Sequence, residues 1–398
     1  MEKSKFIPYG RQDVTQSDVN AVVQVLQSDF LTQGPIVPMF EQKLCDHTGA
    51  KYSVAVNNCT SALHLACLAL GLGTGDVLWT SPITFVASAN CALYCGANID
   101  FVDIELDTAL MSVKKLKEKL ERAEKESVLP KIIIPVHFSG QSCDMKEIYS
   151  LGQKYGFKII EDAAHAIGAK YQNDAVGSCR YSDISVFSFH PVKIITTGEG
   201  GAAMTNNPLL AEKMRLLRSH GITRDPVKMQ NKLAEPWYYE QINLGFNYRM
   251  TDIQAALGLS QLNRLSQYVL HRSKIALLYD EKFKRVSIDI KPLIQKSNRV
   301  SAFHLYVVRV MGGSKERNEI YNNLYKKGIG VNLHYIPVNR QPFFYKKLNY
   351  NLGKNSVKHP LINTDKYYSQ ALTLPLYPGL MSHNVEFIIQ EILKHVKN

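Results

Sequence analysis

The chain has 398 residues, of which 45% are hydrophobic and 21% are charged, and its formal net charge is +12. This composition is typical of a folded globular protein and excludes a disordered one. Apolar runs such as 132–136 are far shorter than the roughly 20 residues that cross a bilayer. The polar first residues do not resemble a signal peptide, so we expect a cytoplasmic protein. The seven cysteines include no C-x-x-C spacing, which argues against a disulfide framework or a zinc site.

The positive charge has two possible uses, a nucleic-acid or membrane partner and an acidic small substrate. The lysines are scattered along helix-like stretches with acidic residues between them, as in 114–121, and no basic cluster is interleaved with aromatic residues. This pattern favours a solvated basic surface with an acidic small ligand. We therefore expect no nucleic-acid partner and no membrane partner.

The chain from 52 to 205 alternates short apolar runs with helix-like stretches. Strands are predicted at 53–56, 77–80, 100–102, 131–136 and 157–160, and helices at 60–70, 85–94, 113–126 and 145–155. This alternation predicts an α/β fold with a mostly parallel sheet and helices on both faces. The unbroken apolar run at 132–134 is typical of a strand that is buried on both sides.

The pattern changes after residue 168. Two shorter strands are predicted at 185–189 and 202–205, and one long helix from Thr251, its N-cap, to about residue 284. The remaining chain contains a predicted strand, helix and strand at 304–310, 315–326 and 331–335. We therefore expect a large domain over residues 1–255, followed over 256–398 by a linking helix and a small α+β domain.

Lys193 lies among apolar residues, after the predicted strand at 185–189 and before the turn 198–201. A lysine held in a partly apolar pocket has a lowered pKa and becomes a nucleophilic amine, suited to forming a Schiff base. Taken alone, the segment favours the simpler interpretation of a loop lysine whose ammonium reaches solvent.

Glu161 and Asp162 end the apolar strand predicted at 157–160. Ligands of open parallel sheets bind beyond the carboxyl ends of the strands, and a carboxylate there can keep a pyridine nitrogen protonated. The small Ala163 and Ala164 would let a flat ring lie against the backbone. An acid at a helix N-terminus is an equally good explanation of the motif alone.

A polar turn, 57–61, joins the first predicted strand to a helix. The N–H groups at a helix start can bind an anion, although simple capping by Thr60 or Ser61 also explains the turn. Phe85, at the start of the next helix, is by itself expected in the core. Together, a phosphate cradle, an aromatic ring, a strand-end aspartate and a loop lysine are what pyridoxal 5′-phosphate (PLP) requires.

The sequence resembles the DegT/DnrJ/EryC1/StrS sugar-nucleotide aminotransferases, which are PLP enzymes of fold type I. The motifs that carry the resemblance cover nearly the whole chain, at 28–35, 60–63, 161–166, 198–201, 219–221, 245–250 and 334–337. The resemblance implies a mostly parallel central sheet in a large PLP-binding domain, a small α+β C-terminal domain, PLP as the cofactor and a homodimer with shared sites.

The resemblance also implies roles for individual residues. Lys193 would form the imine with PLP and Asp162 would pair with the ring nitrogen, as the two catalytic residues, and no metal is implied. The other implied cofactor contacts are His165 near the ring hydroxyl, Phe85 on one ring face, Cys59, Thr60, Ser61 and Ser188 at the phosphate, and Asn247 at the neighbouring subunit's phosphate. The implied substrate contacts are Tyr9, Asp29, Phe30, Leu31, Thr32, Tyr335, Ile336, Pro337 and Val338.

The implied reaction is transamination, because a branch of the family that dehydrates sugars has histidine where this chain has Lys193. Segments 81–87, 137–140 and 186–197 are similar to the branch that acts in pseudaminic acid synthesis. This similarity implies amination by L-glutamate at C4 of a UDP-4-keto-6-deoxy-N-acetyl-hexosamine, giving UDP-4-amino-4,6-dideoxy-N-acetyl-β-L-altrosamine.

Two alternatives stay open at this point. The substrate could be another 3- or 4-keto nucleotide sugar, or the protein could be a non-catalytic regulator that senses PLP. A dinucleotide-dependent oxidoreductase is disfavoured, because the strand at 53–56 is not followed by G-x-G-x-x-G.

Overall fold

The computed structural model describes residues 6–231, 235–285, 289–351 and 360–395. Its centre is a seven-stranded sheet with the strand order β1-β9-β8-β5-β4-β2-β3. The strands are β1 (Tyr52–Val56), β2 (Val77–Thr80), β3 (Asn98–Phe101), β4 (Ile132–Ile134), β5 (Lys158–Asp162), β8 (Ile184–Ser188) and β9 (Gly201–Thr205). Only β9 runs antiparallel to its neighbours, so the predicted mostly parallel sheet is confirmed, with small shifts at the strand ends.

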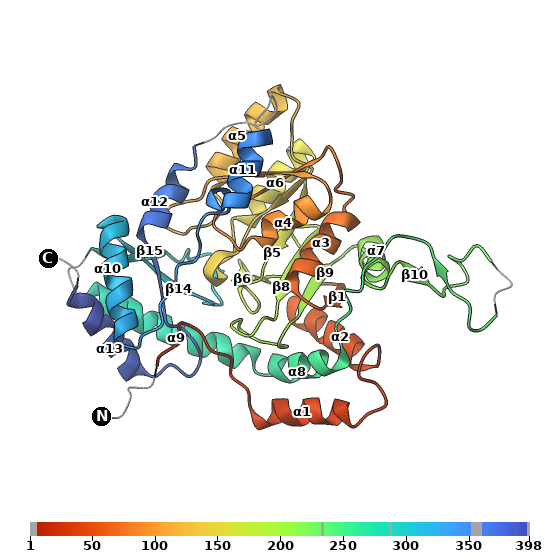
Figure 1. The fold of residues 1–398 in the computed structure, drawn as a ribbon, viewed down its shortest axis with the longest axis horizontal. Coiled ribbons are helices and arrows are strands. Elements are labelled where there is room, and N and C mark those ends of the chain that lie inside the picture. The colour runs from red at the N-terminus through yellow and green to blue at the C-terminus, as the bar shows by residue number, and fades with distance from the viewer. Residues whose placement is uncertain (1–5, 232–234, 286–288, 352–359, 396–398) are drawn as a thin grey trace.

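Helices cover both faces of this sheet (Figure 1). On one face pack α3 (Cys59–Ala69), α4 (Ala87–Tyr94) and α7 (Pro208–Arg218). On the other face pack α2 (Ile36–Thr48), α5 (Val113–Lys125), α6 (Met145–Tyr155) and α8 (Asp252–Leu262). Successive side chains of a strand point to opposite faces, so Ile133 packs on one side and Ile132 and Ile134 pack on the other.

A second, antiparallel sheet consists of β12 (Ile290–Pro292), β14 (Tyr306–Val310) and β15 (Ala371–Leu374). The helices α9 (Leu265–Lys284), α10 (Gly313–Lys326) and α13 (Ser382–Leu393) share its hydrophobic core. Ile7, near the other end of the chain, packs into the same core. The proposed division into domains at residue 255 stays a prediction.

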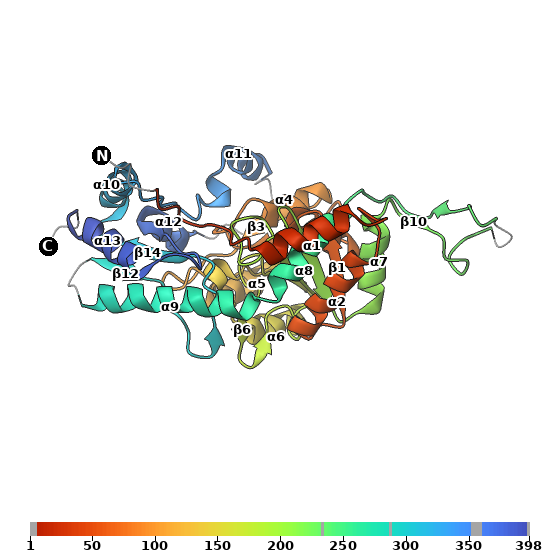
Figure 2. The same cartoon turned by 90° about the horizontal axis from the view of Figure 1, so that it is seen from below.

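The remaining elements connect these two sheets or extend from them. They are α1 (Gln16–Leu26), β6 (Lys170–Tyr171), β7 (Asp174–Ala175), β10 (Ile222–Thr223), β11 (Glu240–Gln241), β13 (Arg299–Val300), α11 (Pro342–Asn351), α12 (Ile362–Gln370) and the 3-10 turns Phe138–Gly140 and Val338–Arg340. The β10–β11 arm projects away from the body in both views (Figures 1 and 2). None of the helices in the described parts of the chain is long and apolar enough to cross a membrane.

The prediction of a single helix from Thr251 to residue 284 is wrong, because the helix is interrupted at residues 263–264, between α8 and α9. Arg264 leaves the helical backbone there, and its guanidinium donates to both carboxylate oxygens of the buried Asp18 at 2.6 and 2.7 Å. Residues 263–264 contain no glycine or proline, so the local sequence carries no sign of this break.

The strand predicted at 331–335 is also wrong, since only Asn332 forms a β-bridge, with Thr373. The chain turns inward after it, so that His334 and Tyr335 line a cavity. The helix predicted from Phe85 begins two residues later, at Ala87, which leaves Phe85 in the preceding turn.

Candidate active site

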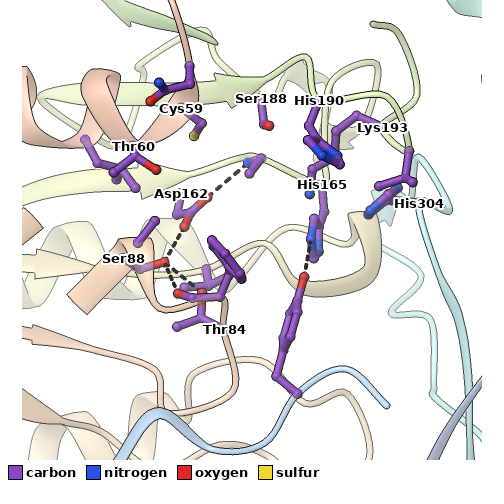
Figure 3. Close-up of a pocket in the computed structure, with 18 of the residues that line it drawn as sticks. Cys59, Thr60, Thr84, Ser88, Asp162, His165, Ser188, His190, Lys193 and His304 are labelled. Atoms are coloured by element: carbon purple, nitrogen blue, oxygen red, sulfur yellow. Dashed lines mark hydrogen bonds between the residues drawn. The ribbon is translucent and has the colours of Figure 1, made fainter. Parts of the chain in front are cut away.

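A cavity of about 950 Å³ opens beyond the carboxyl ends of β5 and β8 (Figure 3). Side chains from the loops of the large sheet form part of its wall. Side chains next to the second sheet form the rest, such as His304, which precedes β14, and Asn332, which forms a bridge with β15. The predicted residues that line it are Tyr9, Cys59, Thr60, Ser61, Phe85, Asp162, His165, Ser188, Lys193 and Tyr335. Residues distant in sequence therefore meet where the parallel-sheet rule places a ligand.

The other predicted site residues lie outside this cavity. Asp29 and Phe30 line a separate cavity of about 510 Å³ beside α1 and α8. Asn247 is exposed and forms a β-bridge with Ser219. Their roles, and those of Leu31, Thr32, Ile336, Pro337 and Val338, stay predictions.

The carboxylate of Asp162 is buried and held by two donors. Ser88 Oγ donates to Oδ2 at 2.6 Å, and the Ala164 N–H donates to Oδ1 at 3.1 Å. A carboxylate has about four acceptor positions, so these two contacts leave capacity for a protonated ring nitrogen. Sequence reasoning missed Ser88, whose only local signal was its place in the first turn after Phe85.

Lys193 lies in the loop after β8, and its backbone N–H donates to the His190 carbonyl at 2.9 Å. Burial of the amine lowers the pKa of Lys193 to about 8, and the nearby Cys59 and Asp162 offset part of that decrease. A larger fraction of the amine is therefore neutral near physiological pH than for an exposed lysine. A neutral, partly desolvated amine is the nucleophile that imine formation needs.

The lowered pKa of Lys193 predicts how covalent PLP uptake depends on pH. The apo-protein should form the lysine imine at a rate that rises with pH and levels off above pH 8. Absorbance in a stopped-flow spectrometer measures this rate. The unfolded chain binds the proton up to the ordinary pKa near 10.5. Between these two values the unfolded state holds more protons, so this group makes the apo-protein more stable as pH rises. A rate that keeps rising through pH 10 would contradict the lowered pKa.

A group of neutral rings borders the lysine. The Ser139 N–H donates to His165 Nδ1 at 3.3 Å, so His165 Nε2 carries the proton and faces the Tyr335 hydroxyl at 3.1 Å. Burial lowers the pKa of His165 and His304 well below the ordinary value and lowers the pKa of His334 to about 3. These histidines therefore carry no charge at neutral pH, and His165 and His334 act as hydrogen-bonding groups. Neither His304 nor His334 was predicted from the sequence.

The start of α3 forms one end of the cavity. Asn58 Oδ1 accepts the Ser61 N–H at 2.8 Å and caps the helix. A Cβ at Gly201 would lie 2.6 Å from Asn58 and Cys59 backbone atoms, so β9 packs directly beneath this turn. The buried Asn57 Oδ1 has no hydrogen-bond partner among the described residues. That oxygen can only accept, so it does not bind an anion, but the N–H groups at this helix N-terminus are donors that fit an anionic ligand group.

Phe85 is 60% exposed, whereas its neighbours Ile83, Thr84 and Ala87 are buried. An exposed ring on the cavity wall suits stacking against a flat ligand. With the polar turn, Asp162 and Lys193, the residues present fit PLP. No group of three or more metal-binding side chains is found in the described parts of the chain.

Beneath Asp162, the adjacent Glu161 points away from the cavity into a buried network. Its carboxylate accepts from His137 Nε2 at 2.7 Å and from Ser182 Oγ at 2.5 Å. The Cys143 N–H donates to His137 Nδ1, so the Nε2–H points to Glu161. This network anchors the end of β5, which carries Asp162.

Replacing His137 by alanine should destabilise the fold, because the buried Glu161 carboxylate loses one of its donors. The expected cost is about 3 kcal/mol, measured as a lower midpoint of thermal unfolding. His383→Ala, at an exposed histidine, is the matched control. Equal midpoints for the two variants would contradict a structural role of the His137–Glu161 pair.

Residues 12–393 match the DegT/DnrJ/EryC1/StrS aminotransferase family. The chain is 39% identical to the UDP-4-amino-4,6-dideoxy-N-acetyl-β-L-altrosamine transaminase of Campylobacter jejuni, with 98% of each chain covered. Its structure resembles that of Helicobacter pylori PseC, an aminotransferase of pseudoaminic acid biosynthesis, with a TM-score of 0.87, 31% identity and coverage of 98% and 99%. It also resembles the PLP form of the putative sugar aminotransferase Spr1654 from Streptococcus pneumoniae, with a TM-score of 0.84, 30% identity and 97% of each chain covered.

These similarities extend over almost the full length of this chain and of each protein compared with it, so they include the cavity and both sheets. They confirm the predicted type I fold and PLP as the cofactor, and the cavity contains a lysine, a carboxylate and a polar turn that fit this cofactor. The chain therefore belongs to the DegT/DnrJ/EryC1/StrS aminotransferase family and is a PLP-dependent sugar aminotransferase.

Proposed function

We propose that this enzyme transfers the amino group of L-glutamate to C4 of a UDP-4-keto-6-deoxy-N-acetyl-hexosamine. The product would be UDP-4-amino-4,6-dideoxy-N-acetyl-β-L-altrosamine, an intermediate of pseudaminic acid synthesis, made in the cytoplasm. The observation that carries this proposal is the full-length similarity to the C. jejuni transaminase, at 39% identity. The cavity of about 950 Å³ has room for a cofactor and part of a sugar nucleotide.

In this proposal the chain's own residues position the cofactor ring and transfer the protons. PLP, when bound, supplies an electron sink that stabilises negative charge on the reacting carbon. Lys193 Nζ removes the proton from the glutamate Cα and later returns a proton to the sugar C4. Asp162 keeps the ring nitrogen protonated, and Phe85 supports one ring face. The neutral His165 and Tyr335 provide hydrogen bonds without adding charge beside the lysine.

We also propose a homodimer in which Asn247 reaches the partner's cofactor phosphate. The exposed position of Asn247, outside its own chain's cavity, supports this arrangement. So does the projecting β10–β11 arm (Figure 2), where the side chains of Val227, Trp237 and Leu244 are 74–85% exposed. Large apolar side chains on a projecting segment are expected to pack against another subunit.

Co-expression of two impaired variants tests whether each active site is shared between the two subunits. In a heterodimer of Lys193→Ala and Asn247→Ala chains, one site carries both changes and the other carries neither. We expect each variant alone to be impaired and the co-expressed, purified heterodimer to regain about half of the wild-type activity. A heterodimer that is no more active than the parent variants would contradict a contribution of Asn247 across the interface.

The substrate is tested with the pyridoxamine-phosphate form of the enzyme, prepared with glutamate and freed of excess donor. We expect the UDP-4-keto-6-deoxy-N-acetyl-hexosamine of the β-L-arabino configuration to restore the PLP absorbance fastest. Its opposite configuration, dTDP-4-keto and GDP-4-keto sugars are the comparison set. Faster restoration by any member of that set would replace the proposed substrate while leaving the reaction class intact.

A further inference from the structure

The hydroxyl groups of Thr84 and Ser88 form a buried chain that ends on the Asp162 carboxylate (Figure 3). Ser88 lies in the first turn of α4, and its Oγ is 2.6 Å from Asp162 Oδ2. Thr84 Oγ1 is 2.7 Å from the same Ser88 Oγ. Phe85 sits in the turn between the two hydroxyls, so the same five residues carry the stacking ring and the contact to Asp162.

The direction of each hydrogen bond follows from the chemistry of the groups. An ionised carboxylate only accepts, so the single hydroxyl hydrogen of Ser88 must point to Asp162. Ser88 Oγ is also 3.4 Å from the Phe85 carbonyl, a longer contact that the one hydrogen cannot serve at the same time. The lone pairs of Ser88 Oγ are then free to accept the hydrogen of Thr84, which fixes the rotamer of Ser88.

We propose that Ser88, oriented by Thr84, is a positioning residue that aims the Asp162 carboxylate at the cofactor's ring nitrogen. The Ala164 N–H restrains the second oxygen, so the carboxylate cannot rotate freely. This inference rests on the cofactor and on the reaction class, and it is independent of which sugar is aminated.

Ser88→Ala removes the hydroxyl and leaves Asp162 with one donor. Pyridoxamine 5′-phosphate binds without a covalent bond, so its dissociation constant, measured by calorimetry on the apo-enzyme, reports the ring contacts directly. We expect this constant to rise about tenfold, the effect of losing one hydrogen bond to a charged group. In single-turnover experiments we expect the glutamate half-reaction to slow by about 10- to 100-fold, with the half-saturating glutamate concentration changed less than about twofold.

Two further variants distinguish loss of the Ser88 hydrogen bond from a nonspecific disruption of packing. Ser88→Thr keeps a hydroxyl and should restore most of the affinity and rate, whereas Thr84→Val, which only releases the Ser88 rotamer, should show a smaller loss in the same direction. Ser53→Ala is the matched control, because Ser53 is a buried serine of β1 whose hydroxyl has no partner among the described residues.

Unchanged cofactor affinity and half-reaction rate in Ser88→Ala would overturn the proposal. An equal loss in Ser53→Ala would do the same, because it would show a nonspecific packing effect. If Ser88→Ala does not fold, Thr84→Val decides the matter, and wild-type affinity and rate in that variant would contradict the proposed chain.

Discussion

Replacing Lys193 by alanine should abolish covalent cofactor attachment and slow turnover by about 1000-fold or more, in line with the loss of a positioned acid–base group. Lys193 has a lowered pKa and lies in the same cavity as Asp162 and Phe85. No other lysine or arginine is among the described residues that line this cavity. No second amine is therefore in place to form the imine or to move the proton.

The measurement combines an absorption spectrum with steady-state turnover on the same preparation. Lys158→Ala is the matched control, because Lys158 starts β5 at the end of the strand opposite Asp162 and makes only an exposed ion pair with Asp183. That pair is worth at most about 1 kcal/mol, so the control should resemble the wild type. Normal turnover by Lys193→Ala would remove this lysine from the mechanism.

Replacing Asp162 by asparagine should lower kcat by about 100- to 1000-fold, the usual effect of removing one electrostatic contact to a developing charge. The amide has nearly the shape of the carboxylate; its one oxygen can still accept the Ala164 N–H, and its NH2 group can donate to Ser88 Oγ. It cannot, however, keep the ring nitrogen protonated. The cofactor should therefore still attach to Lys193 while the proton-transfer step slows.

The half-reaction with glutamate measures this step without the sugar. Asp183→Asn is the control, because Asp183 directly precedes β8, at the strand ends opposite the cavity, and its side-chain oxygen accepts the Ile159 N–H. A change in kcat of less than about threefold in Asp162→Asn would contradict the ring-nitrogen role.

The central sheet and the position of Asp162 and Lys193 on the cavity wall could be predicted because their signals are local. Buried parallel strands such as β4 appear in the sequence as short apolar runs. Asp162 is the last residue of such a strand, and Lys193 lies in the loop that follows another. The order of these motifs along the chain then led to the family resemblance.

Contacts between distant segments could not be predicted in this way. Ser88 reaches Asp162 across 74 residues, and Arg264 breaks the predicted long helix by pairing with Asp18, 246 residues away. The pattern at 331–335 indicated a strand, but only the folded chain shows that His334 and Tyr335 turn toward the cavity. Such features depend on tertiary packing, which overrides local propensity.

Lys193 and PLP together are expected to carry an amino group from glutamate to an acceptor. An absorption spectrum of the purified enzyme, recorded before and after glutamate is added, tests this claim most directly. We expect an imine band at about 410–420 nm that is replaced by a pyridoxamine band at about 330 nm, as is usual for this cofactor. A protein that shows no imine band after incubation with PLP, or a band that glutamate leaves unchanged, would contradict the claim.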